Sequence, residues 1–482
     1  MRPTRLWALL LAATTALPAA AEPILFENAR VFDGTRDLGI TPVLIDGARI
    51  VHVGTPLPAA ATGARRIDYT GKTLLPGLVS DHAHVGNTQG LEHGDRFYTH
   101  DNVVRDLRQF QRYGITTVTA LGMNGADFFA IRKTVNADPR LGAQLYGAGG
   151  GIGAPEGAPP ADTMGLRHDP VARPRNAEEA RAAVATQHAD GVDLIKLWVD
   201  DLGGKRPMMT PEVYGAAIAE AHARGLKVAA HIHDLEQARD LVDAKVDILA
   251  HGIRDRAVDP MLARKMRDQG TWYIPTIAID EANYWYAEHP LALQQPFLRQ
   301  ALHADVLARW SQPDWQRSQL ASDGIPAARK AVATNLDNVR RLHAAGVKLG
   351  FGTDAGAMPQ RVIGVAEHRE LQLLVEAGLT PSEALQVATT QAAALLGLTD
   401  RGRIAAGKRA DLLVLDADPL VDIANTQRIG AVWQAGQEVA GQVRGVARQH
   451  KHPVAGAVAQ GREDAGHRAA VLGQVGVVGQ QI

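Results

Sequence analysis

The chain has 482 residues, of which 46% are hydrophobic and 21% charged, with a formal net charge of −1 and no cysteine. This composition supports a sizeable packed core and argues against wholesale disorder, and the length suits a large barrel that carries a smaller domain. The net charge argues, on average, against nucleic acid or an anionic membrane as partner, and the absence of cysteine excludes disulfides and thiolate metal ligands.

The first residues are typical of a secretory signal peptide. Arg2 and Arg5 form a basic start, an apolar run follows from Leu6 to Leu17, and small residues then precede Glu22. The run is too short for a permanent membrane anchor, and no other stretch of the sequence is apolar enough to span a membrane. We therefore predict a signal peptide over residues 1–21 and a periplasmic or secreted protein. A buried N-terminal helix is the alternative.

Short strands joined by turns are expected in residues 22–74. Asp46-Gly47, a strong hairpin signal, lies between two apolar runs. Similar short apolar runs return in residues 401–443. Two β-rich pieces that flank a long α/β region predict a small β-sandwich built from both ends of the chain.

Between these pieces, over residues 75–400, apolar strand candidates alternate with helical patterns. Helix starts are marked by Thr210-Pro211 and by the capping box from Thr380 to Glu383. Eight strands that alternate with helices predict an α/β fold, a closed (β/α)8 TIM barrel, with a doubly wound open sheet as the alternative. The strands are expected at residues 74–84, 115–122, 144–150, 192–199, 227–233, 247–252, 271–279 and 347–354.

Two segments break this alternation. Residues 281–345 follow the seventh strand and are too long for a simple loop. Their tryptophans and tyrosines are typical either of an active-site lid or of the core of extra helices. Residues 444–482 are rich in Gly, Ala, Val and Gln without a clear periodicity, and we predict a disordered tail there.

Residues that bind metals stand at the ends of four predicted strands. His82 and His84 end the first strand, where alternate side chains face the same side and could grip one metal ion. His231, His251 and Asp354 end the fifth, sixth and eighth strands. One His-x-His pair alone would be a weak signal. In a barrel, however, all these strand ends meet at one face, so together they predict a metal site.

Lys196 lies within the apolar run 192–198. Such a lysine is costly to bury, and burial lowers its pKa so that more neutral amine is present. A neutral amine can add carbon dioxide to give a carbamate, an anion able to bridge two metal ions. The alternative is a lysine whose ammonium group reaches solvent at the strand end.

The ordered set His-x-His, Lys, His, His, Asp resembles the binuclear-metal branch of the amidohydrolase superfamily. Residues 73–84 are similar to the motif that opens the family's barrel, and residues 388–393 and 402–412 to the motifs that close it, so the resemblance covers roughly residues 23–440. Within this superfamily, the sequence most resembles the imidazolonepropionase-like, Xaa-Pro dipeptidase and ochratoxinase-like members. Because true imidazolonepropionases lack the bridging lysine, Lys196 argues against that activity. The long insertion and the tail depart from the family pattern.

The resemblance implies two divalent metal ions as cofactors, of which zinc suits imidazole and carboxylate ligands, with manganese and cobalt as alternatives. The ligands that it implies are His82, His84 and Asp354 for one ion, His231 and His251 for the other, and carbamylated Lys196 together with a hydroxide as bridges. It also implies that Asp354 is the catalytic residue, which takes the proton of the attacking hydroxide and delivers it to the leaving nitrogen.

The predicted substrate is an amide whose product carries a free α-carboxylate, such as a dipeptide or an N-acyl amino acid. Arg254 and Arg256 lie in the loop after the sixth strand, where a guanidinium could clamp a carboxylate. Ordinary surface pairing with Asp255 is the alternative. His233, on the same side of its strand as His231, is expected to contact either the substrate or the metal ligands, and Tyr273 to cover an apolar substituent of the substrate.

Two competing functions remain open. One is an esterase, lactonase or phosphotriesterase that uses the same metals, since leaving-group preference is not encoded in these motifs. The other is a non-catalytic binding protein on the same scaffold, although such a protein would be expected to lose ligands and this sequence keeps the full set. The expected partner is a small-molecule substrate and not a nucleic acid, and a homo-oligomer is left open.

Overall fold

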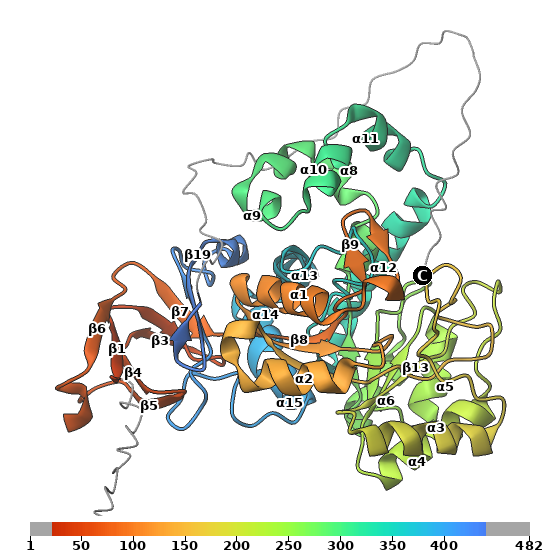
Figure 1. Ribbon diagram of the computed structural model, residues 1–482, viewed down its shortest axis with the longest axis horizontal. Coiled ribbons are helices and arrows are strands. Elements are labelled where there is room, and N and C mark those ends of the chain that lie inside the picture. Colours follow the sequence, from red (N-terminus) through yellow and green to blue (C-terminus); the bar gives the residue numbers. More distant parts are fainter. Residues whose placement is uncertain (1–21, 440–482) are drawn as a thin grey trace, which may run out of the picture.

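The computed structural model describes residues 22–439, which form a β-rich end beside a larger α/β body (Figure 1). The predicted signal peptide at 1–21 and the predicted tail at 444–482 lie outside the described residues. Within residues 22–439, no helix combines the length and the apolar character needed to cross a bilayer.

Two sheets form the β-rich end, at the left of Figure 1. The smaller sheet has the order β5 (Arg49–Val53), β4 (Val43–Asp46), β1 (Ile24–Glu27) and β6 (Arg65–Asp68). The larger sheet has the order β20 (Gln437–Glu438), β19 (Ile429–Gln434), β18 (Leu412–Leu415), β7 (Thr73–Pro76), β2 (Arg30–Phe32) and β3 (Asp37–Ile40). The larger sheet therefore joins strands from both ends of the chain, through the antiparallel pair of β7 and β18.

The hairpin between β4 and β5 turns where the sequence predicts it. Asp46 is paired with Arg49, and Gly47 has a φ of 51°, a left-handed conformation that glycine adopts without steric cost. The two sheets share an apolar core in which Phe26 of one sheet packs edge-on against Trp433 of the other, with ring centroids 5.0 Å apart. Burial of such aromatic area holds the two sheets together.

The α/β body contains two parallel sheets. One has the order β12 (Gln144–Gly147), β11 (Ile115–Ala120) and β8 (Leu78–Ala83). The other has the order β13 (Ile195–Trp198), β14 (Val228–His231), β15 (Ile248–Ala250), β16 (Trp272–Ile274) and β17 (Lys348–Leu349). The predicted strands are present, but most are shorter than expected, and the first is divided at Gly77 so that β7 belongs to the sandwich and β8 to the body.

The hydrogen bonding between neighbouring strands is interrupted at two places, called seams below. The strands therefore form two sheets and not one continuous closed sheet. A single bridge joins Ile152 to Leu197 at one seam, and another joins Ala83 to Ala355 at the other. At the first of these places, Gly149 and Gly151 turn the chain after β12 with φ values of 59° and 83°.

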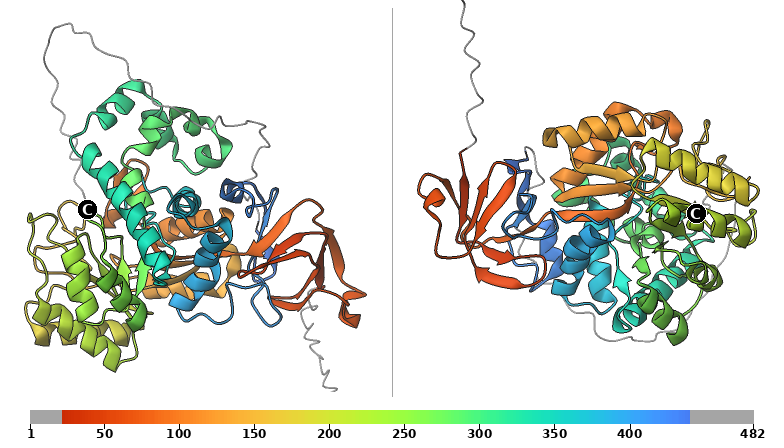
Figure 2. Two further views of the ribbon diagram at one scale, coloured as in Figure 1. Left: turned by 180° about the vertical axis from the view of Figure 1, so that it is seen from behind. Right: turned by 90° about the horizontal axis from the view of Figure 1, so that it is seen from below.

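Helices lie around these strands (Figure 2). Their starts follow capping rules: Thr380 accepts a hydrogen bond from the Glu383 N–H while Glu383 accepts one from the Thr380 N–H, as the sequence predicts. The helices are α1 (His100–Arg112), α2 (Phe128–Ala137), α3 (Ala177–Asp190), α4 (Pro211–Ala223), α5 (Leu235–Asp243), α6 (Pro260–Gln269), α13 (Val365–Glu376), α14 (Pro381–Gln386) and α15 (Ala392–Leu395), the last preceded by a π-helical stretch at Val387–Gln391.

The insertion after β16 forms the helices α7 (Ala278–Glu281), α8 (Trp285–Glu288), α9 (Pro296–Arg299), α10 (Ala304–Trp310), α11 (Pro313–Leu320) and α12 (Ile325–Ala344). Of these, α8 to α11 lie at the top of Figure 1. Trp310 packs on Tyr286 and stacks on Trp315, with ring centroids 4.6 and 5.4 Å apart. These aromatic residues therefore form the core of the extra helices, the second of the two possibilities that the sequence left open.

Candidate metal centre

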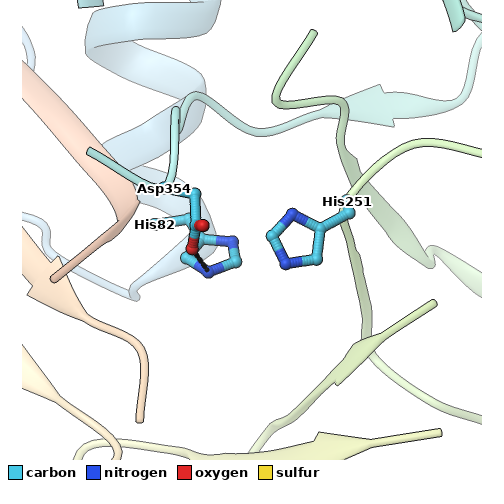
Figure 3. A group of neighbouring side chains, drawn as sticks. All are labelled: His82, His251 and Asp354. Carbon is cyan, nitrogen blue, oxygen red and sulfur yellow. Dashed lines mark ion pairs between the residues drawn. The ribbon is translucent and has the colours of Figure 1, made fainter. Parts of the chain in front are cut away.

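Three predicted ligands from different strands meet at one point (Figure 3). His82 belongs to β8, His251 follows β15 and Asp354 follows β17, and one ligand atom of each lies within 4.8 Å of the others. All three side chains are buried. The carboxyl ends of parallel strands thus deliver two imidazoles and a carboxylate to a volume that one metal ion could occupy.

The backbone at this point adopts conformations that side chains other than glycine rarely accept. His251 has a φ of 87° and Asp354 a φ of 58°, and both the Thr353 and the Asp354 N–H groups donate to the carbonyl oxygen of His82 at 3.0 Å. Such left-handed residues persist only where the surrounding structure enforces them, and they cluster at functional sites. The local strain is a second, independent indication of function.

His84 joins the group through Asp354. The Oδ1 atom of Asp354 lies 3.1 Å from Nε2 of His82 and 3.0 Å from Nε2 of His84. The predicted pair at the end of β8 therefore faces one carboxylate oxygen, as expected for residues two apart in extended backbone. The Nδ1 atoms of both histidines are buried without a hydrogen-bond partner among residues 22–439.

His231 and His251 extend the cluster on the other side. The His251 ring lies 4.5 Å from the His82 ring and 4.5 Å from the His231 ring, measured between centroids. Nε2 of His231 donates to Asp200 Oδ2 at 2.9 Å, and Nδ1 of His251 lies 2.9 Å from Thr276 Oγ1. These partners occupy one nitrogen of each ring, which leaves Nδ1 of His231 and Nε2 of His251 as the atoms that can bind a metal.

Asp200 and Thr276 are functional residues that the sequence motifs do not reveal. Asp200 stands in the turn after β13, and although burial alone would raise its pKa, the hydrogen bond and charge of His231 bring it below the ordinary value of 3.8. Thr276 is fully buried with a φ of 43°, an outlier for a β-branched residue. Both residues lie just past the end of a strand, and this position is the one feature of the sequence that could have indicated a role for them.

Lys196 is buried among these groups, with an exposed fraction of 1%. Its Nζ atom has no hydrogen-bond partner among the described residues and lies 5.2 Å from the Trp198 ring centroid. Burial lowers the pKa of this amine from 10.5 to about 7, against a smaller raising effect of the Asp354 charge. The alternative of a lysine that reaches solvent is therefore wrong.

Burial also keeps the imidazoles neutral. It lowers the pKa of His82 to about 3 and that of His231 to about 4, and it moves the pKa of His251 in the same direction. Neutral imidazole is the form that binds metal ions. A set of neutral imidazoles, a carboxylate and an unpartnered amine fits a divalent metal of the zinc type.

The two arginines proposed to bind substrate have different environments. Arg254 is buried, with Nη2 donating to the Ile232 carbonyl at 3.1 Å and Nη1 3.4 Å from Asp280, while its Nε has no partner among residues 22–439. The Arg256 side chain is 59% exposed and pairs with Asp255 at 2.6 Å. For Arg256 the alternative of ordinary surface pairing therefore holds.

Tyr273 and His233 do not occupy the places expected of substrate-binding residues. Tyr273 is fully buried, and its hydroxyl accepts from the Ile253 N–H at 2.8 Å and donates to Asn335 at 3.0 Å, so it braces the loop after β15 and cannot cover a substrate. The side chain of His233 is 40% exposed and lies 2.6 Å from Asp234. Because β14 ends at His231, strand alternation does not extend to His233.

Comparison with known proteins agrees with this geometry. A family model described as the Amidohydrolase family matches residues 73–447. An imidazolonepropionase of Streptomyces griseus is 26% identical over 82% of this chain and 92% of its own length, and one of Cereibacter sphaeroides is 29% identical over 81% and 93%.

Solved structures are similar over most of the described residues. A Xaa-Pro dipeptidase with bound methionine in its active site matches with a TM-score of 0.69 and 25% identity, over 87% of this chain and all of that one. The ochratoxinase of A. niger, at 20% identity and a TM-score of 0.66, supports the fold alone. The chain belongs to the amidohydrolase family, and the prediction of a hydrolase that acts on carbon–nitrogen bonds is confirmed.

Proposed function

We propose that this protein is a metal-dependent amidohydrolase with two divalent metal ions at the mouth of a (β/α)8 barrel. Zinc is the metal that we propose for both sites. The observation that carries the proposal is the meeting of His82, His251 and Asp354 within 4.8 Å, with neutral histidines and a buried unpartnered amine around them. One ion would be held by His82, His84 and Asp354, the other by His231 and His251, and carbamylated Lys196 would bridge both.

When bound, the metal ions would supply an activated water and a polarised carbonyl. Asp354 then has the task of taking a proton from the attacking water and giving it to the leaving nitrogen. The Asp200 carboxylate, which can only accept, holds His231 in the tautomer with its proton on Nε2, and the Thr276 hydroxyl orients the ring of His251. Lys196, whose burial favours the neutral amine, would add carbon dioxide to form a carbamate and release one proton to solvent.

For the substrate, we propose an amide whose product carries a free α-carboxylate, such as a dipeptide or an N-acyl amino acid. Arg254 is the residue expected to bind that carboxylate, because it is buried, retains an Nε without a partner among residues 22–439, and its charge acts on both His231 and Asp200. The similar Xaa-Pro dipeptidase structure supports this substrate class. The resemblance to the binuclear-metal branch, with Lys196 as its bridging lysine, argues against imidazolonepropionase activity.

The test compares N-acyl amino acids with their methyl esters at the carboxylate, in the wild type and in Arg254→Met. Blocking the carboxylate should reduce wild-type kcat/KM by tenfold or more, roughly the contribution of one charge-assisted hydrogen bond, and Arg254→Met should lose this discrimination. Arg256→Met is the matched control, because Arg256 lies in the same loop but pairs with Asp255 at the surface, and it should discriminate as the wild type does.

Equal turnover of free and blocked substrates by the wild type would refute the carboxylate-binding role. Faster turnover of lactones, simple esters or phosphotriesters than of any amide would instead favour the competing esterase function on the same metals. A purified protein that binds no divalent metal in metal analysis would contradict the proposal as a whole.

A further inference from the structure

The loop that follows β17 carries an arginine whose side chain returns to Asp354. Arg361 is buried, with an exposed fraction of 8%, and its Nη1 forms an ion pair with Asp354 Oδ2. The backbone folds back over the same span, because the Gly356 N–H donates to the Arg361 carbonyl at 2.9 Å and the Arg361 N–H donates to the Met358 carbonyl at 3.0 Å. Residues 354–361 thus form a closed loop with Asp354 and Arg361 at its two ends.

The two oxygens of Asp354 have different partners in this arrangement. Oδ1 faces Nε2 of His82 and of His84, at 3.1 and 3.0 Å, whereas Oδ2 contacts Arg361. Rotation of the carboxylate about its last bond would exchange these environments. A guanidinium on Oδ2 opposes that rotation because its planar array of donors fixes the direction of approach.

The backbone of the loop is held by groups other than the Arg361 side chain. The Thr353 hydroxyl donates to Glu367 Oε1 at 2.5 Å, and the Gly364 N–H donates to Glu367 Oε2 at 2.7 Å. A Cβ atom on Gly356 would lie 2.1 Å from the His84 carbonyl, so the loop packs directly on the end of β8. Removal of the Arg361 guanidinium should therefore free the Asp354 carboxylate more than it disturbs the loop.

Binding of the substrate carboxylate is a less suitable role for Arg361. The guanidinium is already engaged by a carboxylate, so a substrate carboxylate at the same place would lie against Asp354 and be repelled by it. Arg254 is also paired with a carboxylate, that of Asp280, but at the longer distance of 3.4 Å, and it keeps an Nε without a partner among residues 22–439. The two buried arginines thus suit two different tasks.

We propose that Arg361 is a positioning residue for hydrolysis, which holds Oδ2 of Asp354 so that Oδ1 stays directed at His82 and His84. The inference rests on the proposed function, because it acts through Asp354. It predicts that the role depends on a guanidinium at this place, and not merely on a well-packed side chain.

The experiment uses Arg361→Ala in the full-length, metal-loaded enzyme. The kcat should fall by roughly 10- to 100-fold, as is typical of a misplaced catalytic group, while KM changes by about threefold or less. Millimolar guanidinium or methylguanidinium should restore at least a tenth of the lost rate. Zinc titration of the metal-free variant should give a weaker Kd than that of the wild type, and guanidinium should tighten it again. Arg361→Lys should retain an intermediate rate.

Arg401→Ala is the matched control. Arg401 has an exposed fraction of 7% and pairs with Asp400, but it binds Thr117 and Gln144 and not Asp354. Substitution of Arg401 should reduce the stability of the protein. Any loss of kcat in this variant should not be restored by guanidinium.

Two results would overturn the inference, and they are distinguishable. If Asp354→Asn is inactive while Arg361→Ala keeps a normal kcat and zinc affinity, or loses rate that guanidinium does not restore, the positioning role is wrong and the proposed function stands. If Asp354→Asn keeps a near-normal kcat, another group moves the proton, so the catalytic role proposed for Asp354 is wrong and the role of Arg361 fails with it.

Discussion

The burial of Lys196 predicts that Lys196→Met stabilises the metal-free protein even though it removes a functional residue. In the absence of metal and carbon dioxide, the wild type must either bury an ammonium group or give up its proton. The thioether of methionine has nearly the same length and carries no charge. The substitution therefore removes the burial penalty and keeps most of the packing.

The size of the effect follows from the two protonation equilibria. The amine has an ordinary pKa of 10.5 in an unfolded chain and a pKa of about 7 in the folded protein. Each pH unit of difference corresponds to 1.36 kcal/mol, so the penalty is about 5 kcal/mol at pH 7 and below. For a folded region of roughly 400 residues, this corresponds to about 5 °C in Tm.

The stability of the wild type should change with pH in a direction that the two pKa values determine. Between pH 7 and 10.5 the unfolded chain holds a proton that the folded protein releases, so wild-type stability rises with pH across this window. Below pH 7 both states are protonated and the full penalty is present, and above pH 10.5 both are neutral and the penalty disappears. The advantage of Lys196→Met should accordingly be greatest at pH 6–7 and shrink towards pH 10.

The assay is thermal unfolding of chelator-treated protein in carbon-dioxide-free buffer over that pH range. Lys265→Met serves as a control, because the Lys265 side chain is 43% exposed on α6 and its loss should leave the pH profile unchanged. A Lys196→Met variant that is less stable than the wild type at pH 7, or equally stable at all pH values, would refute the buried-amine reasoning. In zinc-loaded protein the same variant should bind less metal and lose turnover.

Three further predictions concern the site and the chain start. Asp354→Asn should lower kcat by 10²- to 10⁴-fold while some metal remains bound through the histidines, which steady-state kinetics and metal analysis would check; a near-normal kcat would mean that another group moves the proton. Prolonged chelation should abolish activity, and zinc with bicarbonate should restore it in the wild type but not in Lys196→Ala; full activity after complete metal removal would contradict metal dependence. N-terminal sequencing of the exported, folded protein should begin at Glu22, whereas an intact Met1 in that form would disprove cleavage there.

The candidate ligands could be predicted from the sequence because they stand at strand ends. Apolar runs locate the strands, and parallel strands bring their carboxyl ends together, so the amino-acid sequence alone is enough to expect that His82, His251 and Asp354 meet. Their partners could not be predicted in the same way. Asp200 and Thr276 act from turns, where no periodicity says which way a side chain points.

The same limit explains the substrate residues. Arg254 and Arg256 are two residues apart in one loop, yet one is buried and the other pairs at the surface. The loop path decides between them, and that path depends on Tyr273 of the next strand and, through it, on Asn335 further along the chain. For the fold, the strand positions could be predicted, whereas the break near Ile152 follows from backbone torsions at Gly149 and Gly151 that apolar patterns do not encode.

The pairing of β7 with β18 has a consequence for the order in which the protein can be completed. During synthesis β7 emerges early, but the strand that covers its edge, at Leu412–Leu415, is among the last to be made. Until then, the edge of an apolar strand stays open to pairing with other chains. A chain that stops near Ala405 would therefore not yield a smaller enzyme. It would leave the edge of β7 unpaired and open to aggregation, so the short C-terminal strands protect the protein from self-association once they have paired.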